Sequence, residues 1–514
     1  MNYIIKTKYM KKIAMASALL TLIAVTSCNK DFIDLKPKSS YTDEAFYKTE
    51  AQFKAAVVAA YAPLRDVLVN DYFTSEMHSD NTGYQPILSN RGTGYVDREN
   101  ISDFTNTSTN AYTAAAWHHS YTGISRCNII IGKLPAADIP EASKTNLDGQ
   151  VKFLRALNYF KLVRLYGPLP LLVTEVAKTS DAFIPRSSVE DVYARIIADA
   201  KDAINELPAP KFPQTGVATK GAATMLLAEV YATQKKWSDA EILLKDLLTM
   251  GYSLYANYDD VFLPANKNGK ESIFEIQFLG GTVTGSTPNP LSFHFIPRST
   301  NTKLLTGITI NNTSTGGWNT PTQNLIDDFE PNDKRLDASI GIAEGTYNAS
   351  DYFTYSAVKS IIGYIPTPGK VGVPYIKKYL HSPLPNTTGS SDNFPVYRYA
   401  DALLLLAEVL NEQPGKSPEA LTYLNMVRDR AFGANVSTIT TADPVALREI
   451  IYHERRVELA FENHRWEDLL RTGRAISVLN AFGITIDNHN LLFPVPNSEI
   501  GVNPQLLPQN PGYF

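Results

Sequence analysis

Cys28 is the residue whose surroundings most clearly indicate a chemical reaction. Four lysines precede an apolar run over residues 13–25, and small residues then lead into this cysteine. That order of charged, apolar and small regions is typical of a secretory signal peptide. The residues before Cys28, Val25 and Ser27 among them, also suit a bacterial lipobox, in which the cysteine thiol receives lipid. The apolar run, about 13 residues, is too short to span a hydrocarbon core as a helix.

We therefore predict a signal peptide over residues 1–27, lipidation at Cys28 and a tether over residues 28–41. The alternative is an ordinary signal peptide that contains a cysteine by chance. In either case the protein is expected to be exported, with its body in water.

Catalytic and metal-binding motifs are missing from the rest of the sequence. His453 begins a segment that resembles a zinc-binding helix, but Val457 occupies the position of the required second histidine. His118-His119 is an adjacent pair, and adjacent helical side chains point about 100° apart, so they do not easily share a metal. The acidic pair Asp327-Asp328 is too generic to identify a glycosidase, whose two carboxylates are defined by their separation in space. We predict a protein without catalysis, cofactor or metal ligand.

Most of the sequence that must position a functional residue has apolar residues at helical spacing. Apolar residues recur at helical spacing over residues 150–166, which Gly167 ends, and over residues 188–206. Residues 222–250 contain two short amphipathic segments, in which Ala228 and Ala240 are small enough to let paired helices approach closely. Such a pair resembles a tetratricopeptide repeat.

Residues 401–430 repeat this plan. Leu405–Val409 matches Leu226–Val230 letter for letter, and a second amphipathic segment follows it. We therefore predict a mainly α fold, in which tetratricopeptide-like helix pairs form a scaffold.

Two regions lack this periodicity. Residues 70–110 and 260–395 are rich in Asn, Ser, Thr and Gly, and contain few strand-like runs, such as Ser272–Phe278. Since binding residues are often found on loops held by a rigid scaffold, we expect function there. The expected division is one body over 42–514, with a helical scaffold over 42–260 and 395–480 and a large loop-rich, irregular region over about 70–110 and 260–395.

Charge and cysteine content exclude some classes of protein. The formal net charge is −4, which does not suggest the basic face that a nucleic-acid surface needs. The chain has two cysteines, and lipidation of Cys28 would leave Cys127 without a disulfide partner. We expect Cys127 to be a buried, small apolar residue and the fold to be stabilised by its core.

An ordered set of segments resembles the SusD/RagB family of outer-membrane lipoproteins of the Bacteroidetes. After the lipobox, the resemblance covers nearly the whole chain. Its segments are Cys28–Asp34, Phe153–Pro170, Lys220–Ala223, Phe394–Glu408, Glu454–Gly473 and Gln509–Tyr513.

The resemblance implies a nutrient-binding protein of the cell surface with tetratricopeptide-like helix pairs and no catalysis. It also implies a partner, a SusC-like TonB-dependent barrel transporter on which such a protein sits as a hinged lid. The Arg- and Glu-rich segment over 454–474 is expected to be structural, with its charges paired and Trp466 packed inside.

The ligands of this family are mostly glycans, so the resemblance implies an oligo- or polysaccharide. A sugar ring has an apolar face that stacks on aromatic rings, and hydroxyls that need polar partners at the edge. The loops offer two such groups of residues. Trp318 is the strongest candidate, because a tryptophan beside two glycines in a polar loop is expected to be exposed. The ligand-binding candidates are Trp318 and Asn319 in one loop, and Tyr72, Phe73, Asp80, Asn81, Tyr84, Arg91 and Tyr95 in the other.

A second hypothesis remains open. A helical-repeat lipoprotein at the same surface can instead bind peptides or proteins, for which an extended groove with backbone partners is expected. Glycan capture predicts a few exposed aromatic rings in one place.

Overall fold

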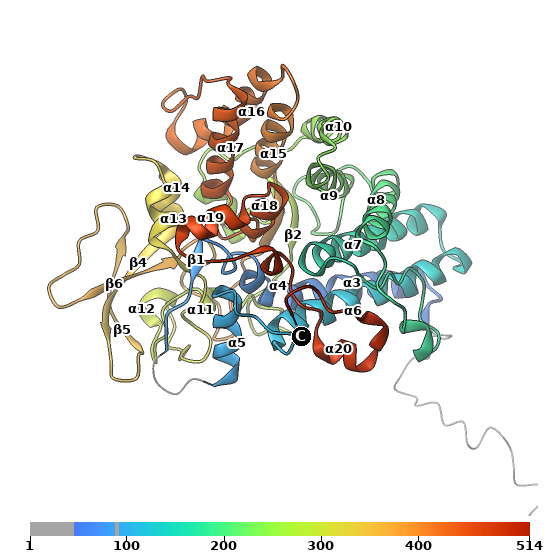
Figure 1. The fold of residues 1–514 in the computed structure, drawn as a ribbon, viewed down its shortest axis with the longest axis horizontal. Coiled ribbons are helices and arrows are strands. Elements are labelled where there is room, and N and C mark those ends of the chain that lie inside the picture. The colour runs from blue at the N-terminus through green and yellow to red at the C-terminus, as the bar shows by residue number, and fades with distance from the viewer. Residues whose placement is uncertain (1–45, 88–91, 514) are drawn as a thin grey trace, which may run out of the picture.

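The computed structural model of the protein describes residues 46–87 and 92–513 (Figure 1). The predicted signal peptide, the lipidated Cys28, the tether and the candidate Arg91 lie outside these described residues. Among the residues described, no helix combines the length and apolarity needed to cross a membrane.

The N-terminal part of the body is a layer of packed helices. Local sequence sets their ends: the Thr49 hydroxyl caps α3 (Glu50–Tyr61) by accepting from the Gln52 N–H, and Ser188 caps α8 (Val189–Glu206). Gly167, with φ of +71°, ends α7 (Glu141–Tyr166) in a backbone region that favours glycine. The helices are α3 (Glu50–Tyr61), α4 (Pro63–Thr74), α5 (Thr93–Ser102), α6 (Ala111–Lys133), α7 (Glu141–Tyr166), α8 (Val189–Glu206), α9 (Lys220–Thr233) and α10 (Trp237–Leu248).

A second group of helices completes the scaffold. The longer ones are α15 (Tyr399–Asn411), α16 (Ser417–Phe432) and α17 (Pro444–Glu458). The shorter ones are α11 (Leu291–His294), α12 (Lys303–Thr306), α13 (Gln323–Asp328), α14 (Lys334–Ser339), α18 (Arg465–Arg471), α19 (Ala475–Phe482) and α20 (Asn497–Val502).

The predicted helix pairs are confirmed. α9 packs against α10, α15 packs against α16, and α10 contacts α15, so the two pairs adjoin (Figure 1). Ala228, Ala240 and Ala407 are fully buried, which allows the close approach of helix axes that their size predicts. The matching segments of α9 and α15 therefore occupy equivalent inner positions of two tetratricopeptide-like pairs.

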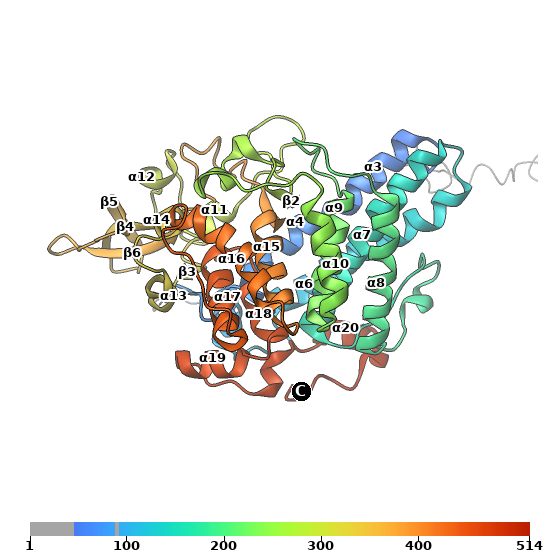
Figure 2. The same ribbon diagram turned by 90° about the horizontal axis from the view of Figure 1, so that it is seen from above.

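Short strands link the helices. β2 (Ser272–Ile276) pairs antiparallel with β7 (Phe394–Arg398), and a three-stranded sheet has the order β5 (Phe353–Ser360), β4 (Ile340–Tyr347), β6 (Val371–Ile376). This sheet projects at one end of the molecule, opposite α3 (Figure 2). The region over residues 70–110, expected to be loop-rich and irregular, also contains the end of α4, which runs to Thr74, and the whole of α5.

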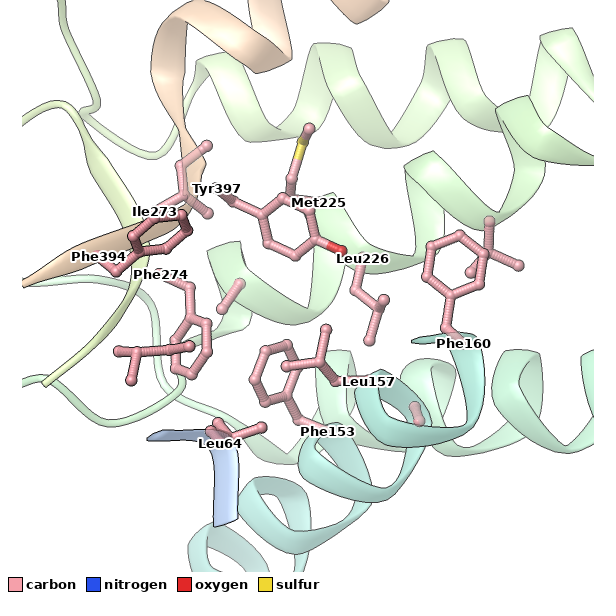
Figure 3. Close-up of a cluster of buried hydrophobic side chains, with 14 of the residues drawn as sticks. Leu64, Phe153, Leu157, Phe160, Met225, Leu226, Ile273, Phe274, Phe394 and Tyr397 are labelled. Atoms are coloured by element: carbon pink, nitrogen blue, oxygen red, sulfur yellow. The ribbon is translucent and has the colours of Figure 1, made fainter. Parts of the chain in front are cut away.

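One large core joins the helical layer to the strands. Figure 3 shows side chains of α4, α7, α9, β2 and β7 meeting there, with Phe153 and Phe274 in edge-to-face contact at a centroid distance of 4.9 Å. Each such side chain contributes about 1.5–3 kcal/mol on full burial. Cys127 is fully buried in the same core, as predicted.

The charged segment over residues 454–474 is structural, as expected. Arg455 pairs with Asp401 at 2.9 Å and with Asp468 at 3.0 Å. Trp466 is 1% exposed and packs against Phe104. These contacts tie α17 and α18 to α15 and to the loop after α5.

Candidate functional site

The structure brings the two predicted groups of candidate residues together. β1 (Thr82–Gly83) pairs antiparallel with β3 (Thr320–Pro321), with Thr82 opposite Pro321. The Thr82 hydroxyl donates to the Asn319 side-chain oxygen at 2.6 Å, and the Gln85 N–H donates to the Gly317 carbonyl at 2.8 Å. Two loops that are far apart in the sequence thus form one region.

Trp318 lies inside this region and not on its surface. Its side chain is 2% exposed, so the expectation of an exposed ring was wrong. The neighbouring glycines explain the error. A Cβ on Gly316 would come within 2.3 Å of the Asn312 side chain, and Gly317 has φ of +80°. The glycines therefore allow a tightly packed turn that carries Trp318 inwards, where sequence alone suggested an open loop.

Five other candidates are also buried and have structural partners. The Tyr72 hydroxyl bonds to the His294 ring at 3.0 Å, and burial lowers the pKa of His294 to about 4. The buried candidates are Tyr72, Phe73, Asp80, Asn81 and Asn319, all at most 2% exposed.

Asp80 and Asn81 connect the loop after α4 to α17 and α18. Asp80 pairs with Arg465 at 2.8 Å and with Arg456 at 2.9 Å. Burial alone would raise the pKa of Asp80, but its hydrogen bond with Arg465 and the charges of Arg465 and Arg456 hold it below its usual value. Asn81 donates to Glu76 at 3.0 Å, and burial raises the pKa of Glu76 to about 7. We therefore infer that Asp80 and Asn81 hold the loop after α4 in position.

Tyr84 and Tyr95 are the candidate rings that are partly exposed. Tyr95 stacks on Trp318, with a centroid distance of 5.8 Å and an interplanar angle of 28°, and donates its hydroxyl to the Thr313 carbonyl at 3.1 Å. Tyr84 lies 6.1 Å from Trp318 and donates to Asp103 at 2.8 Å. The buried Trp318 therefore supports two rings that are part of the surface.

Arg98 completes the group, and sequence reasoning missed it. Its guanidinium carbon lies 4.9 Å from the Trp318 ring centroid and 4.7 Å from that of Tyr112. It is 5.7 Å from the centroids of Phe73 and Tyr95. Tyr95 and Arg98 are three residues apart on α5, so predicting that helix would have placed both on one face. We call Phe73, Tyr84, Tyr95, Arg98, Tyr112 and Trp318 the Trp318 cluster.

A polar pocket of about 320 Å³ lies nearby, between α17 and α19. Its charges neutralise one another: Arg456 pairs with Asp328 at 3.0 Å, and Arg474 with Glu449 at 2.8 Å. It is lined by few aromatic residues. The Trp318 cluster is therefore the better candidate for binding a ligand with apolar faces and polar edges.

The described residues contain no group of three or more His, Cys, Asp or Glu side chains that could hold a metal ion. The side chains of the Trp318 cluster are suited to stacking, hydrogen bonding and attraction of charge.

Family models match two parts of the chain. The model described as "SusD family" matches residues 270–513, and the model described as "Starch-binding associating with outer membrane" matches residues 31–232. Together they include β1, β3, α5 and the Trp318 cluster.

Individual relatives match over nearly their full length. SusD-like protein P2 of Formosa agariphila is 28% identical, over 98% of this chain and 99% of its own. The starch-binding protein SusD of Bacteroides thetaiotaomicron is 22% identical, over 99% of this chain and 100% of its own.

Solved structures share the fold. A laminarin-binding SusD-like protein is 27% identical, with a TM-score of 0.72, covering 91% of this chain and 100% of its own. Surface glycan-binding protein A from Bacteroides fluxus is 25% identical, with a TM-score of 0.71 and the same coverage.

Proposed function

The chain belongs to the SusD family, and on this premise we propose that it is a glycan-binding lipoprotein of the cell surface. It captures an oligo- or polysaccharide and delivers it to a SusC-like TonB-dependent transporter in the outer membrane. It holds the glycan without cleaving it. The relatives named for binding starch, laminarin or surface glycans support a carbohydrate ligand.

The observation that carries this proposal is the stack of Tyr95 on Trp318. A pyranose ring has an apolar C–H face, and the partly exposed tyrosine offers it a flat apolar surface. Since Trp318 and α5 hold Tyr95 in place, little side-chain freedom is lost when the sugar binds. Tyr84 supplies a second ring close by.

We expect Tyr95→Ala to weaken glycan binding by about 1–3 kcal/mol, which corresponds to the loss of one aromatic contact. The measurement is calorimetric titration of the purified mature protein with the best ligand from a panel of neutral and acidic oligosaccharides. Tyr95→Phe keeps the ring and should bind nearly as the wild type does.

Tyr423 on α16 provides a matched control, because it is partly exposed on the scaffold and outside the Trp318 cluster. Tyr423→Ala should leave affinity unchanged. Equal affinities for wild type and Tyr95→Ala, with both proteins folded, would show that the glycan does not bind at Tyr95. Release of reducing ends from the bound oligosaccharide by carefully purified protein would contradict binding without catalysis.

The lipid anchor is tested at Cys28. Cells fed a labelled fatty acid should label the wild-type protein, and Cys28→Ala should remain unlabelled, because the thiol is the attachment point. A single acyl chain binds membranes only marginally, whereas two or more give stable anchoring. The wild type should therefore fractionate with the outer membrane and Cys28→Ala should not. Label in Cys28→Ala would show that lipid is attached at another residue and would overturn the assignment to Cys28.

A further inference from the structure

Arg98 carries a positive charge that no carboxylate in the described structure neutralises. Its Nε atom has no hydrogen-bond partner, and no ion pair joins Arg98 to another of the described residues. Other arginines of this protein behave differently. Arg335 and Arg398 each pair with Glu458, at 3.0 and 2.5 Å.

The surroundings of Arg98 hold its guanidinium in place while leaving its edges free. Four aromatic rings lie within 5.7 Å of the guanidinium carbon, and such faces attract a cation through their negative quadrupole potential. Aromatic faces accept no conventional hydrogen bond from the N–H edges of the fork. Arginine remains charged at any physiological pH, and its planar fork matches a carboxylate or sulfate group.

A second observation points the same way. Buried nitrogen donors without hydrogen-bond partners lie around the segment over residues 317–319, and each of them needs an acceptor. They are the Arg98 Nε, Arg298 Nε, Trp318 Nε1, Gln85 Nε2 and Asn319 Nδ2 atoms. The Arg298 guanidinium donates to the carbonyls of Gln85 and Pro86, at 2.7 and 2.9 Å. The region therefore contains several buried donors without a hydrogen-bond partner among the described residues.

Resting on the proposed function, we propose that the captured glycan is acidic. A carboxylate or sulfate group of the sugar forms a two-point contact with the Arg98 guanidinium, while the ring beside it stacks on Tyr95. Arg98 thus selects acidic over neutral glycans, and Tyr95 contributes affinity for both.

The test compares three classes of oligosaccharide of matched length on the mature protein. Oligomers of alginate or polygalacturonate carry carboxylates, those of carrageenan carry sulfates, and laminarin oligomers are neutral. We expect at least one acidic class to bind more tightly than the neutral class, with an affinity that falls as salt is raised. Which acidic class binds identifies the group that Arg98 contacts.

Arg98→Gln should weaken binding of the preferred acidic oligomer roughly 10- to 100-fold, the range for a hydrogen-bonded charge, and should change neutral binding little. Arg98→Lys keeps the charge but not the fork, and should fall between the two. Arg126 on α6 is an exposed arginine outside the cluster, so Arg126→Gln is the control and should bind normally. Thermal melts establish that each variant is folded.

The possible failures are distinguishable. Preference of the wild type for neutral oligomers, or equal loss of acidic and neutral binding in Arg98→Gln, would overturn the role of Arg98 and leave glycan capture standing. Absence of binding to any of the three classes and to a wider glycan array would overturn the proposed function itself. If Arg98→Gln does not fold, the wild-type preference and the Arg98→Lys variant still decide the question.

Discussion

Replacing Glu458 by alanine is expected to lower the free energy of unfolding by about 3–5 kcal/mol, because three buried guanidinium groups lose their shared counter-charge. Glu458 is fully buried at the end of α17. It accepts from Arg398 at 2.5 Å, from Arg335 at 3.0 Å and also from Arg430. Water cannot reach these charges to replace the carboxylate. Urea denaturation of wild type and variant measures the loss.

Glu449 on the same helix is the matched control. It is 59% exposed and pairs with Arg474 at the surface, where an ion pair contributes about 0–1 kcal/mol. Glu449→Ala should therefore unfold almost as the wild type does. A similar small loss for Glu458→Ala would mean that the buried charges rearrange or are reached by water.

The effect of Glu458 should depend on pH. Burial alone would raise the pKa of this carboxyl, but the charges of Arg430, Arg398 and Arg335 hold it well below its usual range. A group with a depressed pKa stabilises the fold above the pKa of its unfolded state, and this contribution is lost as pH falls towards the folded value. The difference between wild type and Glu458→Ala should thus be full at neutral pH and shrink in acid.

Trp318→Ala is expected to destabilise the protein by about 3–5 kcal/mol, the range for removing a large buried aromatic side chain. Trp318 contacts the rings of Phe73, Tyr84 and Tyr95 and lies under the Arg98 guanidinium. Its loss would leave a cavity and remove the support of the surface rings. Urea denaturation should show the loss of stability, and titration at a temperature where the variant is folded should show weaker glycan binding.

Trp318→Phe keeps an aromatic ring at this buried position but makes it smaller. It should therefore lose less stability than Trp318→Ala. Tyr95→Ala provides the opposite comparison, because its partly exposed ring should matter more for binding than for folding. A normal melting temperature for Trp318→Ala together with lost binding would restore the view of Trp318 as a direct ligand platform.

Local sequence determined the scaffold of this protein. The spacing of apolar residues over 150–166 and 188–206, with Gly167 and Ser188 at helix ends, placed α7 and α8. The repeated segment at Leu226–Val230 and Leu405–Val409 indicated two equivalent helix pairs. Such features are readable because helix periodicity and capping depend on residues only a few positions apart. The ordered set of motifs also indicated the SusD/RagB family.

Only the tertiary structure decided the candidate site. Sequence selected Tyr84, Tyr95 and Trp318, but it could not show that β1 and β3 bring their loops together. The glycines before Trp318 suggested exposure, whereas they permit a crowded inward turn, and Arg98 looked like one charge among several in a polar segment. Burial and charge pairing depend on which distant segments meet. The position of the Arg98 guanidinium beside Tyr95, without an ion pair among the described residues, therefore becomes visible only after the chain has folded.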